Sequence, residues 1–196
     1  LHRRCRVIGV DIKEHVIDES RAMAKRLGYH NMTFICADLR TYQPPKNVTA
    51  VISLHACDIA TDLALGTAIR AKAKYIACVP CCHKELRPQL RSPKVLAPML
   101  QFGIHAGQQA EMLTDTIRAL LLKAYGYDTK VFEFVALEHT SKNKMILATK
   151  RSGFSAPDPE VLAQIQALKE MYGIQKHSLE LLLNDQWDQQ NIGCKC

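Results

Sequence analysis

Short apolar runs alternate with longer amphipathic segments through the first half of the chain. Four runs are rich in β-branched residues and end at a polar residue or a proline, a pattern typical of buried strands. They are residues 5–12, 32–39, 49–58 and 74–80. The segments after the first and third runs carry apolar residues at helical spacing. Because uniformly apolar strands alternate with helices, the pattern predicts an α/β fold with a parallel sheet covered on both faces.

The second half of the chain predicts its elements in a different order. Residues 84–105 contain three prolines and predict a loop with a short helix. Residues 106–127 show the clearest helical periodicity, and Gly126 is placed to end that helix. Residues 129–150 predict two strands joined by a hairpin, which would close the sheet.

The character of the chain changes from about residue 152. Asp158 is placed as a helix N-cap, Pro159 stands at the first helical position, and a second short helix follows. We therefore expect a main domain over residues 1–151 and a small helical appendage over residues 152–196.

The charge of the chain is compatible with a polyanionic partner. Lys and Arg number 26 against 19 Asp and Glu, which gives a net charge of +7. RNA is one such partner, although an ordinary basic protein has the same surplus. No apolar run reaches the roughly 20 residues that a membrane helix needs, so we expect no membrane partner. The sequence does not predict an oligomeric state.

The cysteines favour a reduced, cytoplasmic protein. The chain has 8 cysteines, several of them inside or at the end of apolar runs, where a reduced thiol behaves as a small hydrophobic group. We expect Cys5, Cys36 and Cys78 to pack in the core.

Polar residues gather where the predicted strands end. Asp11, Asp38, the 55–58 run and the 80–83 run follow four different strands. Ligands of parallel α/β sheets bind outside the carboxyl ends of the strands. The pattern therefore predicts one site at this edge of the sheet, with an acidic residue suited to bind ribose hydroxyls.

Several segments together resemble the class I S-adenosylmethionine (SAM)-dependent methyltransferase family that has a Cys-Cys-His motif after its fifth strand. They are "GVDIK", "CADL", "SLHACD-ATD-AL", "VPCCHKEL", "LTDTIRALLL" and "LEHTSKNKMI", and they extend from about Arg6 to Lys150. That family includes a tRNA ribose 2′-O-methyltransferase. The resemblance implies a Rossmann-like, seven-stranded sheet and S-adenosyl-L-methionine as the cofactor.

The resemblance also implies roles for individual residues. The cofactor-binding set that it implies is Asp11, Ile12, Ala37, Asp38, Leu39, His55 and Ala56. The residues placed to act on the acceptor are His55, Cys57, Cys81, Cys82, His83 and His139. The substrate-binding candidates are Pro80, Lys84, Arg87, Arg91, Glu138 and Asn143, three of which are basic residues suited to phosphate.

One feature of that family is missing from the sequence. No Asp-x-Gly-x-Gly pattern occurs in the chain, although such a loop lets backbone N–H groups approach the cofactor. The resemblance therefore implies a sheet without its first, central strand. We expect the chain as given to bind SAM poorly, and an intact parent protein to bind it.

The cysteines after two strands leave several chemistries open. A metal site is compatible with cysteine and histidine ligands, but adjacent cysteines depart from the usual Cys-x-x-Cys spacing of structural zinc sites, so we expect no metal. A Cys81–Cys82 disulfide would be strained. Cys57 and Cys81 also occupy places comparable to the cysteines of RNA 5-methylcytosine enzymes, where a thiolate attacks the pyrimidine ring.

The sequence predicts a SAM-dependent methyltransferase that acts on RNA, with a tRNA ribose hydroxyl as a candidate acceptor. A histidine would then serve as base, with His55, His83 and His139 as candidates. One alternative is cysteine-dependent methylation of an RNA pyrimidine. Another is a truncated, non-catalytic domain that binds RNA or a protein partner through its basic loop.

Overall fold

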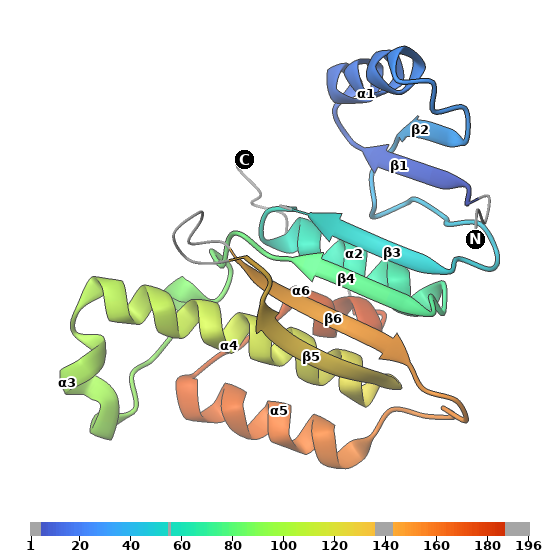
Figure 1. The fold of residues 1–196 in the computed structure, drawn as a ribbon. Helices are drawn as coiled ribbons and strands as arrows, with labels where there is room; N and C mark the ends of the chain where they lie inside the picture. Colours follow the sequence, from blue (N-terminus) through green and yellow to red (C-terminus); the bar gives the residue numbers. More distant parts are fainter. Residues whose placement is uncertain (1–4, 55, 136–142, 187–196) are drawn as a thin grey trace. The chain divides into compact units, whose positions relative to one another are not determined.

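The computed structural model describes residues 5–54, 56–135 and 143–186. Strands and helices alternate along these residues, which confirms the α/β prediction (Figure 1). The strands are β1 (Val7–Asp11), β2 (Met32–Cys36), β3 (Ala50–Leu54), β4 (Tyr75–Val79), β5 (Tyr127–Glu133) and β6 (Lys144–Lys150). The helices are α1 (Glu14–Arg26), α2 (Ile59–Arg70), η1 (Arg87–Gln89), η2 (Lys94–Leu96), α3 (Ala97–Leu100), α4 (Gly103–Ala124), α5 (Pro159–Tyr172) and α6 (Ser178–Leu183).

The described strands pair in two separate sheets. β1 and β2 form a parallel pair, and the other four strands have the order β3-β4-β6-β5. β3 is parallel to β4, whereas β6 is antiparallel to both β4 and β5. The hairpin predicted for residues 129–150 is therefore present, and it makes the larger sheet mixed. No described strand pairs with β1 on its other side or with the outer edge of β3.

The chain divides into two compact units, Leu1–Pro44 and Pro45–Cys196, which we call the first and second units. In the first unit, α1 buries Ile17 and Ala24 and packs beside β1 and β2. Gly9 of β1 leaves room for Phe34, because a Cβ atom at Gly9 would lie 2.7 Å from the Phe34 ring. Cys5 and Cys36 were expected in the core, but both are exposed. Cys5 lies before β1, and Cys36 is the last residue of β2, so neither lies in the interior of a strand.

The core of the second unit lies between one face of the four-stranded sheet and its helices. Tyr127, Ile76, Cys78 and Ile146 project from that face and are almost fully buried. Against them pack apolar side chains from α2, α4, α5 and α6, among them Leu65, Ile117, Ile165 and Leu179. The C-terminal helices thus contribute to the same core as the sheet. The domain boundary near residue 151 stays a prediction.

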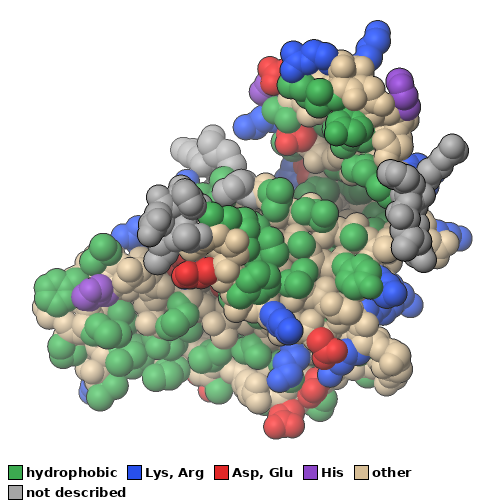
Figure 2. All heavy atoms as spheres, viewed as in Figure 1, with side chains coloured by type: hydrophobic (Ala, Val, Ile, Leu, Met, Phe, Trp, Pro, Cys, Tyr) green, Lys and Arg blue, Asp and Glu red, His purple; other side chains and the backbone are tan. Residues whose placement is uncertain are grey.

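The opposite face of the four-stranded sheet carries exposed apolar side chains. Ile52 and Leu54 of β3 are 68% and 62% exposed, and Tyr75 and Phe132 are also exposed. Figure 2 shows hydrophobic side chains gathered over this sheet. The sequence predicted a sheet covered on both faces, as parallel strands usually are. The exposure of these apolar side chains differs from that expectation. Among the described helices, none has the length and apolar character needed to cross a membrane.

Helix α5 begins as the sequence predicted. The Asp158 side chain accepts hydrogen bonds from the backbone N–H groups of Glu160 and Val161, and Pro159 occupies the first helical position. The helix ends at Gly173 in the left-handed conformation, with φ 67°. A side chain at Gly173 would also collide with Arg91, whose Cδ lies 2.8 Å from the Cβ position.

Helix α6 is held by the half-buried carboxyl group of Glu85, from the loop after β4. Ser178 donates through its hydroxyl and its backbone N–H to the two carboxylate oxygens of Glu85, at 2.6 and 3.2 Å. Burial, assisted by the charge of Asp62, raises the pKa of Glu85 to about 7 from its ordinary 4.5. His177, the residue before α6, is fully buried, and burial lowers its pKa to about 4.

We expect Glu85 and His177 to give the fold opposing pH dependences. The stabilisation linked to protonated Glu85 is complete below about pH 4.5 and is lost as the pH rises through about 7. Neutral His177 instead stabilises above about pH 6.5, and that stabilisation is lost as the pH falls through about 4. The free energy of unfolding of Glu85→Gln should therefore rise relative to the wild type between pH 4.5 and 7, by up to about 3 kcal/mol.

Urea denaturation at a series of pH values measures this difference. Glu170→Gln is the matched control, because Glu170 is exposed on α5 of the same unit, and its difference from the wild type should stay flat. A flat difference for Glu85→Gln as well would show that this carboxyl group titrates normally in the folded protein.

Candidate active site

The residues predicted from the sequence to form one site fall in both units. Asp11, Ile12, Ala37, Asp38 and Leu39 belong to the first unit, and the remainder belong to the second. His55, Glu138 and His139 lie outside the described residues. Each unit is therefore considered separately.

In the first unit, the two acidic strand ends lie beside each other. β1 and β2 are parallel neighbours, and the backbone oxygen of Asp11 accepts a hydrogen bond from Ala37 N at 2.9 Å. One carboxylate oxygen of Asp11 accepts from Lys13 N at 2.8 Å, and Ile12 is 60% exposed. Asp11 thus stands at the carboxyl end of a parallel strand, where ligands of α/β sheets bind.

Asp38 is engaged by a neighbouring arginine. Its carboxylate accepts from Arg40 Nε at 2.6 Å and from Arg40 N at 2.9 Å. The hydrogen bonds from the Arg40 side chain hold the pKa of Asp38 below its usual value. Asp38 is therefore ionised and paired, a state that the sequence did not indicate.

In the second unit, the ends of β3 and β4 bring three sulfur atoms together. Leu54 and Val79 are register partners at the ends of these parallel strands, so the chain leaves the sheet at neighbouring points. The Cys57 and Cys81 sulfurs are 3.4 Å apart, and the Cys81 and Cys82 sulfurs are 3.7 Å apart. A disulfide bond would need about 2.05 Å, so these are separate sulfur atoms in contact.

The Cys81 thiol is protonated at neutral pH. Burial, together with the side chains of Cys57 and Cys82, raises its pKa to about 12. A nucleophilic cysteine requires the thiolate, so the surroundings of Cys81 disfavour that role in the metal-free chain. Cys78 lies within β4 and is a core residue, as expected. Burial raises the pKa of its thiol to about 12 as well.

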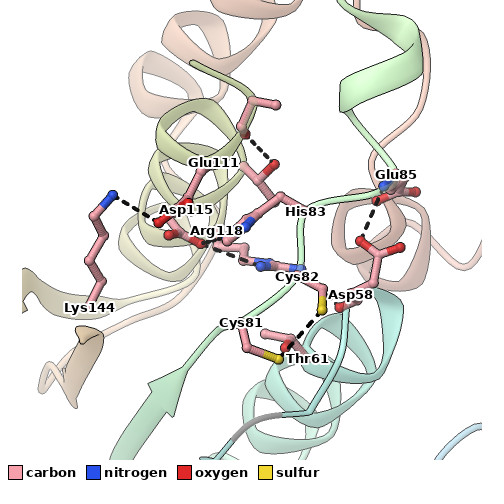
Figure 3. A network of polar contacts seen from close by, with 12 residues as sticks. Asp58, Thr61, Cys81, Cys82, His83, Glu85, Glu111, Asp115, Arg118 and Lys144 are labelled. Carbon is pink, nitrogen blue, oxygen red and sulfur yellow. Dashed lines mark hydrogen bonds and ion pairs between the residues drawn. The ribbon is translucent and has the colours of Figure 1, made fainter. Parts of the chain in front are cut away.

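The loop after β4 continues between α2 and α4, and each helix holds it by one polar contact (Figure 3). Toward α4, His83 Nε2 is 3.0 Å from Asp115 Oδ1, and both side chains are nearly buried. Toward α2, the backbone N–H of Glu85 donates to Asp58 Oδ1 at 3.2 Å. An aspartate bound to one ring nitrogen fixes the tautomer and orientation of a histidine. His83 is therefore placed as a proton acceptor or donor.

A buried arginine links the two helices behind this loop. Arg118 of α4 donates through Nε and a terminal nitrogen to both carboxylate oxygens of Asp62 on α2, each at 2.8 Å. It also donates to the backbone oxygen of Asp58 at 3.0 Å and lies 3.4 Å from Asp115. Burial alone would lower the pKa of Arg118, but Asp62 and Asp115 outweigh burial and raise it. The guanidinium is therefore permanently charged and paired.

This arginine cluster was not predicted from the sequence. A signal for it was present, because Arg118 borders the helix face that Leu113, Ile117 and Leu121 make apolar, and Asp115 lies one turn before Arg118 at a spacing that suits an ion pair. Charged residues at core positions are almost always paired. The partner on α2, Asp62, could not be assigned from spacing alone.

Two further polar groups at the site are only partly satisfied. Asp115 Oδ2 and Asn143 Oδ1 are buried and have no hydrogen-bond partner among the described residues. Asn143 donates through Nδ2 to the backbone oxygen of Val135 at 2.8 Å and so ties the start of β6 to the end of β5. Asp58, the residue before α2, adopts a strained backbone with φ 52° and ψ −117°. Unsatisfied and strained groups of this kind concentrate at functional sites.

The remaining predicted residues of the second unit differ in their surroundings. Pro80 is buried at the end of β4, and the backbone oxygen of Ala56 accepts from the Thr61 hydroxyl. Lys84, Arg87 and Arg91 are exposed. Arg91 also has a structural role, because its backbone N–H donates to Tyr172 at 2.8 Å and its side chain lies against Gly173.

Comparison with known proteins connects part of the chain to methyl transfer. Residues 1–89 match the family model described as "Methyltransferase domain". The matched segment includes both strand-end aspartates and extends through the Cys57 and Cys81–His83 region. The match supports a methyltransferase, and it implies S-adenosyl-L-methionine as the cofactor.

Curated relatives are similar to between 40% and 73% of this chain. Proteins named "Glutathione S-transferase C-terminal domain-containing protein" from Bos taurus and Homo sapiens are each 25% identical over 167 residues, covering 73% of this chain and 26% of the relative. The protein of the same name from Xenopus laevis is 34% identical over 79 residues. That match covers 40% of this chain and 12% of the Xenopus protein. The chain thus spans about a quarter or less of the length of these relatives.

Solved methyltransferase structures are also similar. A putative rRNA methylase from Clostridium thermocellum has a TM-score of 0.48 at 16% identity. The match covers 75% of this chain and 73% of that protein. Magnesium protoporphyrin IX methyltransferase from Synechocystis, with bound S-adenosylhomocysteine, has a TM-score of 0.44 at 15% identity. The match covers 74% of this chain and 64% of that protein.

Proposed function

We propose that this chain is part of a SAM-dependent methyltransferase whose acceptor is cytoplasmic RNA, with a ribose hydroxyl of tRNA as the candidate group. The observation that carries the proposal is the match of residues 1–89 to a methyltransferase domain. That segment holds an acidic residue at the end of a parallel strand and a histidine on the loop after β4. The aspartate suits a nucleoside cofactor, and the histidine suits proton transfer.

Asp11 would hold the ribose of the cofactor. A carboxylate at the end of a parallel strand can accept hydrogen bonds from both ribose hydroxyls. Ala37 and Leu39, which flank the Arg40-paired Asp38, would lie around the adenine. When bound, the cofactor supplies an electrophilic methyl group, so that the protein's task is to position the acceptor in line with it.

His83 is the candidate general base of the proposed reaction. A hydroxyl acceptor must lose its proton as the methyl group is transferred, and a histidine oriented by a carboxylate is suited to accept it. Asp115 orients His83 at 3.0 Å and would stabilise the imidazolium that forms. Arg118 in turn lies 3.4 Å from the same Asp115 oxygen. The buried cluster thus supports the base.

An RNA acceptor is supported by charge close to this histidine. Lys84 follows His83 directly, Arg87 begins the short helix η1, and both side chains are exposed. Exposed cations can contact phosphates without losing an internal partner. The overall charge of +7 acts in the same direction.

Replacement of Asp11 should weaken binding of the cofactor product. We expect Asp11→Asn, in the protein at its natural full length, to bind S-adenosylhomocysteine about 10- to 100-fold more weakly, because charge-assisted hydrogen bonds contribute about 1.5–3 kcal/mol. Isothermal titration calorimetry measures this affinity. Asp18→Asn is the matched control, since Asp18 is exposed on α1 of the same unit and pairs with Arg21. Equal affinity of both variants and the wild type would contradict the role of Asp11.

Charge reversal beside His83 should weaken RNA methylation in a salt-dependent way. We expect the double variant Lys84→Glu/Arg87→Glu to raise the apparent KM for bulk RNA and to lower the slope of log affinity against log salt by about 2, one for each lost phosphate contact. Transfer of a labelled methyl group from SAM to RNA reports activity, and Lys25→Glu on α1 serves as control. Retained RNA binding without any transfer by the wild type would instead favour a non-catalytic RNA-binding domain.

A further inference from the structure

Three sulfur atoms converge at the ends of β3 and β4. The ligand atoms of Cys57, Cys81 and Cys82 all lie within 4.8 Å of one another. Two of these residues are adjacent in the sequence, whereas Cys57 comes from the other strand end. The convergence therefore depends on the parallel pairing of β3 with β4, and the spacing of the cysteines in the sequence does not show it.

The separation of the sulfurs fits a common metal ligand sphere. A tetrahedral zinc ion with Zn–S bonds of about 2.3 Å places its sulfur ligands about 3.8 Å apart. The contacts of 3.4 and 3.7 Å lie close to that separation, and all are far longer than a disulfide bond of about 2.05 Å. Small movements of the side chains would therefore bring all three sulfurs onto one ion.

The donor set selects the kind of cation. Thiolates are soft ligands that favour Zn²⁺ and similar thiophilic ions over Mg²⁺ or Ca²⁺, which take oxygen ligands. Three protein ligands also leave one position of a tetrahedral ion open, as in catalytic zinc sites. That position would be available to water.

We propose that Cys57, Cys81 and Cys82 form a binding site for a thiophilic divalent cation, with Zn²⁺ as the natural occupant. On binding, three sulfur–metal bonds form, three S–H bonds break, and the protons pass to solvent. No oxidation or reduction takes place. The site is independent of the proposed methyl transfer. It assigns the vicinal cysteines to metal ligation, although their adjacent spacing in the sequence predicts no metal.

Titration of the metal-free full chain with Cd²⁺ tests the site directly. Cadmium replaces zinc at thiolate sites and gives a thiolate-to-metal charge-transfer absorption in the ultraviolet. We expect this band to saturate at one equivalent and about three protons to be released per ion in an unbuffered titration. Competition between Zn²⁺ and Cd²⁺ gives the zinc affinity. Absence of a saturable band in the wild type would overturn the proposal.

Serine variants locate the ligands. Cys57→Ser and Cys82→Ser should each weaken Cd²⁺ binding by at least about 100-fold. Replacement of a residue that only supports a metal ligand already lowers metal affinity about 10- to 100-fold, and loss of a ligand itself should cost at least as much. Cys36→Ser is the matched control, as Cys36 is exposed in the first unit, and Cys194→Ser/Cys196→Ser tests the terminal thiols. Unchanged affinity in Cys57→Ser and Cys82→Ser, or loss only in the terminal double variant, would overturn the proposal. Far-UV circular dichroism establishes that each variant is folded.

Discussion

The second unit depends on one buried guanidinium group. Arg118 is fully buried, and it can remain so only because Asp62 binds it with two hydrogen bonds and the Asp58 backbone oxygen takes a third. Loss of either partner of a buried ion pair costs about 3–5 kcal/mol, since it leaves an unpaired charge in the core. The position of α2 against α4 is therefore strictly defined, and the loop after β4 lies between these helices (Figure 3).

The candidate functional residues of the second unit lie close to the ion pair between Arg118 and Asp62. His83 is tied to α4 through Asp115, and Glu85 is tied to α2 through Asp58. The sulfurs of Cys57 and Cys81 meet because their strands are parallel neighbours. The proposed base and two of the three proposed metal ligands thus lie on the loop after β4, and Cys57 joins them from the loop after β3. The same framework would serve both the proposed methyl transfer and the proposed metal site.

Much of the fold was predictable from periodicity, because apolar runs and helix signals depend on local sequence. The N-cap of α5 at Asp158 and the β5–β6 hairpin are examples. Long-range partners were not predictable in the same way. The pairing of Arg118 with Asp62 joins residues 56 positions apart, and spacing does not reveal it. Cys36 was expected in the core but is exposed, because β2 ends at that residue.

A double-mutant cycle on Arg118→Met and Asp62→Leu is the most direct measurement of the central claim that this ion pair holds α2 to α4. Each single variant should lower the free energy of unfolding by about 3–5 kcal/mol. The double variant should lose less than the sum, with a coupling energy of at least about 2 kcal/mol. Single effects that add within about 0.5 kcal/mol would contradict the account, because the two side chains would then stabilise the protein independently.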